Sequence, residues 1–176
     1  MKFTETAIAG VWLIDLEPLT DERGFFARTF CADEFAAHGL DPTVAQCNVS
    51  LTSEAGSIRG LHYQVAPAAE TKLVRVVRGA NHDVAVDLRP CSTTYRRHVA
   101  VELSAENRRA MYVPADFAHG FQTLVADTEV EYQMGAPYTP GTDRGLRYDD
   151  PALAIPWPRP VTTISQKDRT WPLLTR

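Results

Sequence analysis

Apolar and polar residues alternate along many short stretches of the chain, and turn residues separate these stretches. A period of two is typical of β-strands that bury one face. The pattern predicts strands over residues 11–16, 24–30, 43–48, 57–64, 72–77, 82–88, 97–103, 110–113, 120–125 and 130–134. Residues 32–38, just before Gly39, have the one convincing helical pattern. Short strands at this spacing favour a mostly β sandwich or barrel.

The last part of the sequence has a different character. Prolines become frequent after Pro137 and the alternation fades. We therefore expect a single domain over residues 1–176, with a β core over about 1–136 and an irregular tail over about 137–176 that wraps the core and contributes to the site. Trp157 and Trp171 are expected to anchor this tail.

Composition narrows the class of protein. Hydrophobic residues make up 44% and charged residues 23% of the 176 residues, values typical of a folded globular domain and not of a disordered or fibrous chain. The formal net charge of -4 provides no overall attraction for nucleic acid or an anionic membrane, so we expect neither as a partner. An anionic ligand would need a local basic patch.

Cysteine content and apolar run length bear on the compartment. Cys31, Cys47 and Cys91 are odd in number and include no C-x-x-C pair, which fits neither a disulfide framework nor a thiolate zinc site. No stretch has the length of a membrane span, and the first residues lack the pattern of a secretory signal. We expect a cytoplasmic protein.

Residues 59–64 (RGLHYQ) place His62 in a predicted strand, close to Arg59. Four further side chains that can move a proton or hold a negative charge follow: Lys72, His119, Tyr132 and Asp168. Histidine and tyrosine transfer protons, lysine can stabilise an enolate, and arginine binds phosphate bidentately. By strand parity Arg59 and His62 face opposite ways, so a shared pocket requires a bulge near Gly60.

Two further expectations follow from the residues alone. Asp83 can lie near Lys72 if their strands are neighbours. His62, Glu70 and His119 supply two imidazoles and a carboxylate, which could hold a metal as in metal-binding cupins, although the usual H-x-H pair is here His62-x-Gln64. A metal-dependent cupin oxygenase or isomerase therefore remains an alternative.

Five motifs together point to one family: residues 21–26 (DERGFF), 59–64 (RGLHYQ), 83–89 (DVAVDLR), 114–121 (PADFAHGF) and 165–168 (SQKD). In their order and spacing the chain resembles the dTDP-4-dehydrorhamnose 3,5-epimerase family over nearly its whole length. The resemblance implies a cupin-type double-stranded β-helix, or jelly roll, with a few short helices. It also implies a homodimer, no cofactor or metal, and a dTDP-linked 4-keto-6-deoxyhexose as substrate in rhamnose-type deoxysugar biosynthesis.

The resemblance also implies roles for particular residues. His62 would be the general base and Asp168 would orient its ring. Tyr132 would return a proton from the opposite face, and Lys72 would stabilise the enolate. The positions that match substrate-binding residues are Arg23 and Arg59 for the diphosphate, and Gln46, Asn48, His119, Tyr138 and Lys167 elsewhere on the ligand.

Three positions depart from the family pattern. Arg28 and Asp143 both stand where glutamate is common, at positions expected to contact the nucleotide, so the nucleobase stays open. Residues 48–50 read Asn-Val-Ser where Asn-His-Ser is common. Because related enzymes invert one carbon with the same catalytic set, a C3- or C5-only monoepimerase remains an alternative.

Overall fold

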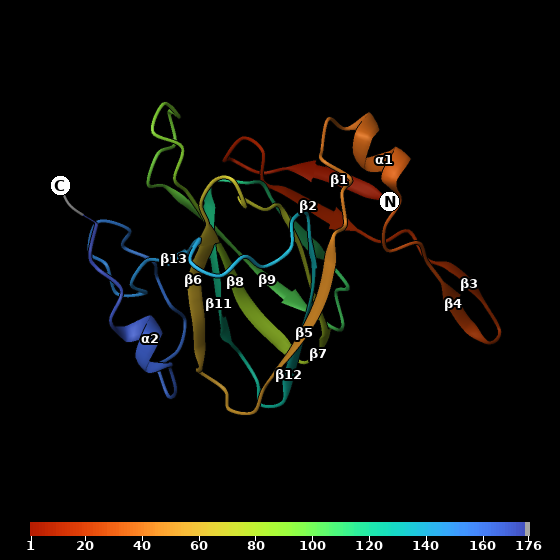
Figure 1. The fold of residues 1–176 in the computed structure, drawn as a ribbon. Coiled ribbons are helices and arrows are strands. Elements are labelled where there is room, and N and C mark those ends of the chain that lie inside the picture. Colours follow the sequence, from red (N-terminus) through yellow and green to blue (C-terminus); the bar gives the residue numbers. More distant parts are fainter. Residues whose placement is uncertain (175–176) are drawn as a thin grey trace.

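Residues 1–174, which this computed structural model describes, form two large antiparallel β-sheets that pack face to face and a separate two-stranded sheet (Figure 1). The strand order of the first sheet is β1 (Lys2–Glu5), β2 (Trp12–Asp15), β10 (Ala110–Val113), β7 (Lys72–Arg78), β12 (Thr128–Met134) and β5 (Gln46–Thr52). The order of the second is β13 (Asp143–Gly145), β6 (Ile58–Gln64), β11 (Phe117–Thr123), β8 (Ala80–Asp87) and β9 (His98–Ser104). The predicted mostly β, jelly-roll fold is confirmed.

The main core lies between the two sheets. Val74, Val76 and Val130 reach it from the first sheet, and Phe117 and Phe121 from the second. Each of these side chains is almost fully buried. The alternation predicted from the sequence thus selects the inner face of each sheet, as sandwich packing requires.

The outer face of the second sheet is covered by the tail. Val84 and Val86 of β8 pack there against Leu153 and Ile155. Trp157 packs on the same cluster, and its indole donates a hydrogen bond to the carbonyl of Tyr148 at 2.8 Å. The tail is less irregular than expected, because it contributes strand β13 and a second helix, α2 (Gln166–Arg169).

The outer face of the first sheet is covered by helix α1 (Ala32–Ala37), which agrees with the predicted helix over 32–38 apart from its last residue. Phe35 is the buried residue of the helix and packs with Ile14, Leu73 and Tyr112. The tail and α1 thus cover part of the outer face of each sheet, and beside the core a pocket is lined by residues of both sheets.

No described helix is long and apolar enough to cross a membrane.

Several strand predictions differ from the structure. The expected strand over 24–30 is only β4 (Gly24–Phe26), paired with β3 (Leu19–Asp21) in an exposed hairpin. The strand expected over 43–48 is β5, shifted to Gln46–Thr52. The edge strand β1 and the three-residue strand β13 were not predicted, because short strands carry too little alternation to be recognised.

The expectation that Asp83 lies near Lys72 across neighbouring strands is wrong. β7 and β8 are consecutive, but they belong to different sheets, and the chain passes from one sheet to the other at Gly79. Gly79 has a φ of 78°, a conformation that glycine adopts at little cost. Asp83 and Lys72 consequently have other partners.

Candidate active site

A pocket of about 900 Å³ opens between the two sheets and beneath the tail. Its size is within the range of small-molecule sites. All the predicted site residues line this pocket except Arg23 and Arg28. The first sheet contributes Gln46, Asn48, Lys72 and Tyr132, the second Arg59, His62 and His119, and the tail region Tyr138, Asp143, Lys167 and Asp168.

A bulge brings Arg59 and His62 to the same pocket. His119 of β11 pairs with His62, whereas Phe121, two residues on, pairs with Arg59, three residues back, so β6 has one extra residue. The bulge falls at Gly60, whose φ is 131°. A side chain there would not fit, since a Cβ on Gly60 would lie 2.5 Å from the Cα of Gly120. The expected irregularity at Gly60 is confirmed.

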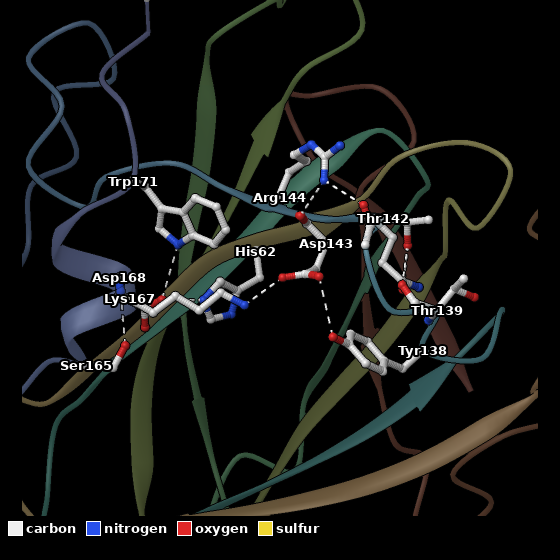
Figure 2. Close-up of polar contacts among 12 residues, drawn as sticks. His62, Tyr138, Thr139, Thr142, Asp143, Arg144, Ser165, Lys167, Asp168 and Trp171 are labelled. Atoms are coloured by element: carbon white, nitrogen blue, oxygen red, sulfur yellow. Dashed lines mark hydrogen bonds and ion pairs between the residues drawn. The ribbon is translucent and has the colours of Figure 1, made fainter.

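The His62 ring is bonded to Asp168 of the tail, with 2.6 Å between Nε2 and Oδ1 (Figure 2). Burial acts to raise the pKa of Asp168, but hydrogen bonds from His62, Gly60 and Ser165 together hold that pKa below its ordinary value. The carboxylate is therefore ionised and accepts the Nε2 proton. This leaves Nδ1 as the basic nitrogen of a side chain that is 46% exposed.

The single turn of α2 sets the position of Asp168. Ser165 caps the helix, and its hydroxyl accepts a hydrogen bond from the Asp168 amide at 3.0 Å. The Trp171 indole donates to Oδ1 of Asp168 at 3.3 Å, as Figure 2 shows. Trp171 was expected to anchor the tail, but its contact with the aspartate was not predicted. The residues after the SQKD motif therefore also shape the site.

A second histidine–aspartate pair lies directly across from the first. His119 of β11 is the strand partner of His62, and its Nε2 lies 2.7 Å from Oδ1 of Asp83. Asn81 donates to the other oxygen of Asp83 at 2.9 Å. Both members of this pair are almost fully buried. Asp83 had no predicted role, although its DVAVDLR motif was noted.

Tyr132 reaches the pocket from β12, on the opposite wall from His62. Its ring stands edge-on to the His119 ring, with 6.2 Å between centroids. Its hydroxyl lies 3.3 Å from the Ser50 hydroxyl. Burial raises the pKa of Tyr132 well above its ordinary value, so the phenol keeps its proton and can act as an acid.

Lys72 is buried at the base of the first-sheet wall. Its Nζ donates to Oε1 of Glu70 at 2.6 Å and to the His62 carbonyl at 3.4 Å. Burial lowers the pKa of Lys72, and the Glu70 carboxylate opposes this shift. Glu70 precedes the first residue of β7, so strand parity did not identify it as the partner of Lys72.

The metal alternative can be tested by how its three candidate ligands are arranged. His62, Glu70 and His119 are each bonded to a different partner, namely Asp168, Lys72 and Asp83. Within residues 1–174 no three histidine, cysteine or acidic side chains are grouped so that they could hold a metal ion. The arrangement does not fit the metal-binding set considered from the sequence.

Polar and charged side chains form the rim of the pocket. Lys167 and Asp143 are ion-paired at 2.6 Å, and the Tyr138 hydroxyl donates to the same carboxylate at 3.4 Å (Figure 2). The Lys167 ammonium lowers the pKa of Asp143. Gln46 accepts a hydrogen bond from the Tyr138 amide at 3.1 Å. These contacts join the rim of the first sheet to the tail.

Arg59 and the two remaining arginines differ in position. Arg59 lines the pocket, and its guanidinium donates to Thr52 at 2.9 Å. Arg23 lies on the β3–β4 hairpin, ion-paired with Asp21, and its side chain is 83% exposed. Arg28 is paired with Glu34 of α1 at 2.6 Å. Within one chain, neither Arg23 nor Arg28 lines the pocket.

The fold and the pocket together define a class. The pocket of this jelly roll is lined by two histidines that each pair with a buried aspartate, by a protonated tyrosine and by a buried lysine. Such a fold and site define a cupin-type protein equipped for proton transfer. Comparison with known sequences makes this specific, since the model of one family matches residues 5–176. The chain belongs to the dTDP-4-dehydrorhamnose 3,5-epimerase family.

Individual relatives are similar over almost the whole chain. A curated dTDP-4-dehydrorhamnose 3,5-epimerase from Sinorhizobium fredii is 47% identical, over 99% of this chain and 90% of its own. The crystal structure of the Bacillus anthracis enzyme with TDP and pyrophosphate bound is 43% identical, with a TM-score of 0.93 over 98% of this chain and 99% of that one. A 3′-monoepimerase from Streptomyces bikiniensis in complex with dTDP-quinovose is 33% identical, with a TM-score of 0.88 over 96% and 85% of the two chains.

Proposed function

We propose that the protein epimerises a dTDP-linked 4-keto-6-deoxyhexose at C3 and C5, without a cofactor, in rhamnose-type deoxysugar biosynthesis. The observation that carries this proposal is the placement of a base and an acid on opposite walls of one pocket. His62 belongs to β6 of the second sheet and Tyr132 to β12 of the first. A sugar ring held between them would have one proton carrier on each face.

The reaction follows from these positions. Nδ1 of His62 removes the proton from a carbon next to the C4 ketone, and the electron pair moves to the ketone oxygen to give an enolate. Lys72 stabilises the negative charge on that oxygen. The Tyr132 hydroxyl then protonates the opposite face of the same carbon, which inverts it. Asp168 stabilises the imidazolium that forms on His62.

The nucleotide would lie along the rim. Arg59 would bind the diphosphate, because a guanidinium makes paired hydrogen bonds to phosphate oxygens. We assign further contacts to the side chains that border the same space: Gln46, Asn48, His119, Tyr138, Asp143 and Lys167. The bound TDP of the Bacillus anthracis relative supports a nucleotide ligand for a site of this kind.

We further propose a homodimer in which the β3–β4 hairpin carries Arg23 to the partner's pocket. Leu19 and Phe26 of the hairpin are 73% and 74% exposed, as expected of apolar residues that a partner subunit would cover. The β5 edge of the first sheet, with exposed Val49 and Leu51, is a second apolar surface. Arg28 follows the same hairpin and would approach the nucleotide with Arg23. The three free cysteines support a reducing, cytoplasmic location.

The proposed activity can be tested by NMR. The protein is incubated with dTDP-4-keto-6-deoxyglucose in deuterium oxide, and exchange is followed at C3 and C5. We expect exchange and inversion at both carbons with the wild-type protein and neither with His62→Ala. The matched control is His38→Ala, which removes an exposed histidine at the C-terminal end of α1. This variant should behave as wild type.

The other outcomes separate the alternatives. Exchange at C3 alone would identify a monoepimerase, the alternative left open by the Asn-Val-Ser sequence at residues 48–50. Activity that disappears with a chelator and returns with iron, zinc or manganese would support the metal-dependent alternative. No exchange at either carbon would reject this substrate.

A further inference from the structure

Glu70 has no part in the reaction described above, yet it lies in the wall of the pocket with a side chain only 4% exposed. Its Oε1 accepts the hydrogen bond from Lys72. Its Oε2 is buried and has no hydrogen-bond partner among the described residues. A buried carboxylate oxygen without a partner is unfavourable, so stability alone does not explain a glutamate at this position.

The hydrogen bonds of Lys72 point to a function. An ammonium group has three N–H donors. One goes to Glu70 at 2.6 Å and a second to the His62 carbonyl at 3.4 Å. The third has no acceptor within residues 1–174. Because the two protein acceptors fix the tetrahedral group, the third N–H is held in one direction beside the pocket.

Glu70 also controls the charge of Lys72. On its two sides in the sheet Lys72 pairs with Val113 and Met134, neither of which is charged. The other titratable and charged side chains that line the pocket are Glu54, Arg59, His62, Tyr63, His119, Tyr132, Tyr138, Asp143, Arg144, Lys167 and Asp168. Burial lowers the pKa of Lys72, and the charge that opposes this is the Glu70 carboxylate.

We propose that Glu70 is a positioning residue, which keeps Lys72 as an ammonium ion and leaves one N–H free for the ketone oxygen of the substrate. This inference rests on the proposed function, because it assigns Lys72 to the enolate oxygen. It adds that the oxyanion site has two parts, a cation that contacts the substrate and an anion behind it. Stabilisation of the enolate by Lys72 would therefore depend on the charge of Glu70 as well.

Glu70→Gln tests the charge, since glutamine keeps the size of the side chain and an oxygen that can accept the Lys72 bond. We expect kcat at neutral pH to fall at least about tenfold. Lys72 acts as the ammonium ion, so activity is lost as pH rises through its pKa. Loss of the Glu70 charge lowers that pKa and moves the alkaline limb of the kcat profile to lower pH, by about one unit or more. Glu102→Gln, on the exposed part of β9, should change neither quantity.

A second readout does not require turnover. The Cε signal of Lys72 in protein labelled with ¹³C-lysine, assigned with Lys72→Met, reports its ionisation directly. We expect it to titrate at lower pH in Glu70→Gln than in wild type. If the wild-type protein turns over no substrate, the proposed function fails while this comparison still tests the pairing.

Glu70→Asp separates position from charge. The shorter side chain keeps the carboxylate but draws the ammonium away from the pocket. We expect kcat to fall while the Lys72 titration stays close to that of wild type. Wild-type kcat in both variants, or a Lys72 titration that is the same in Glu70→Gln as in wild type, would overturn the proposal. If the glutamine variant does not fold, the aspartate variant decides, since wild-type kcat there contradicts the role.

Discussion

At the scale of single residues, the His62–Asp168 pair combines a half-exposed base with a buried carboxylate. The exposed ring can reach a substrate, while the buried partner holds it through a 2.6 Å hydrogen bond. The pKa of Asp168 is held low, so the carboxylate stays ionised at neutral pH and can stabilise an imidazolium. The charge of this aspartate should therefore matter more than its size.

Asp168→Asn tests that charge. We expect kcat to fall by about 10²–10⁴-fold with little change in the midpoint of urea unfolding, because asparagine has the same shape but cannot stabilise the imidazolium. Steady-state kinetics and urea denaturation measure the two effects. Asp33→Asn on exposed α1 is the control for a generic loss of charge. A kcat within a factor of about three of wild type would mean that His62 works without this partner.

Tyr132→Phe tests the division of labour between base and acid. Burial keeps the phenol protonated, so its removal takes away a proton donor and no charge. We expect the variant still to exchange the sugar proton with deuterium through His62, while the yield of inverted product falls by about a hundredfold. NMR follows both quantities in one sample. Inversion at the wild-type rate would show that another group protonates the second face.

At the scale of elements, the bulge in β6 is what lets one strand present both Arg59 and His62 to the pocket. Gly60→Ala tests it. We expect a loss of more than about 3 kcal/mol in the free energy of unfolding, because the new Cβ would meet the backbone of Gly120 at 2.5 Å and the backbone would be strained.

Gly141→Ala is the matched control for that substitution. Gly141 also has a positive φ, of 88°, but a Cβ there would meet nothing within 4 Å. Strain alone should cost about 1–2 kcal/mol. Chemical denaturation measures both variants, and equal losses would mean that the close approach of β6 and β11 contributes nothing.

The elements also explain how far the sequence could be interpreted. Alternation located β7 and β8 well, because their inner faces are apolar. It misplaced β5. In this strand the polar side chains of Asn48 and Ser50 line the pocket, whereas the apolar side chains of Val49 and Leu51 are exposed, which reverses the usual pattern of apolar residues inside and polar residues outside. β5 is an edge strand, and its pocket-facing side chains are polar. A strand of this kind lacks the apolar alternation by which buried strands are recognised.

Side-chain chemistry pointed to candidate site residues that the strand pattern could not single out. His62 stands in the RGLHYQ motif, whereas Lys72 and Tyr132 lie outside the five motifs and received their roles from the resemblance; all three line the pocket. Glu70 and Asp83 were not assigned their roles, because acidic residues are common and a buried partner has no signature of its own. The expectation that Asp83 lies near Lys72 required β7 and β8 to share a sheet. They do not, and Lys72 pairs with Glu70; no local sequence pattern determines this.

At the scale of the whole molecule, Arg23 on the exposed hairpin does not line the pocket of its own chain, and the proposed dimer would bring it to the pocket of the partner. If Arg23 serves the partner's pocket, Arg23→Ala and His62→Ala should complement each other. In a mixed dimer one pocket would carry both defects and the other neither. We expect each variant alone to be nearly inactive, and mixtures refolded together to regain up to about a quarter of wild-type activity, from one intact pocket in half of the dimers.

Size-exclusion chromatography with light scattering checks that the mixed species are dimers. The control is a mixture of His62→Ala with Asp168→Asn. His62 and Asp168 pair within one chain, so each pocket of the mixed dimer keeps one defect and no intact pocket forms. Activity in the control, or none in the Arg23 mixture, would contradict delivery of Arg23 by the partner.

The tail supplies Asp168 from a four-residue helix, 106 residues away from His62 in the sequence. His62 is therefore built into a sheet strand, whereas Asp168 lies on a short helix outside both sheets. We expect this segment to open at a lower free energy than the sheets. Enzyme activity should consequently disappear at lower urea concentrations than the β-sheet circular dichroism signal. Heat or protease damage confined to the tail would leave a well-folded but inactive protein, so assays of folding alone would overestimate the functional lifetime of the enzyme.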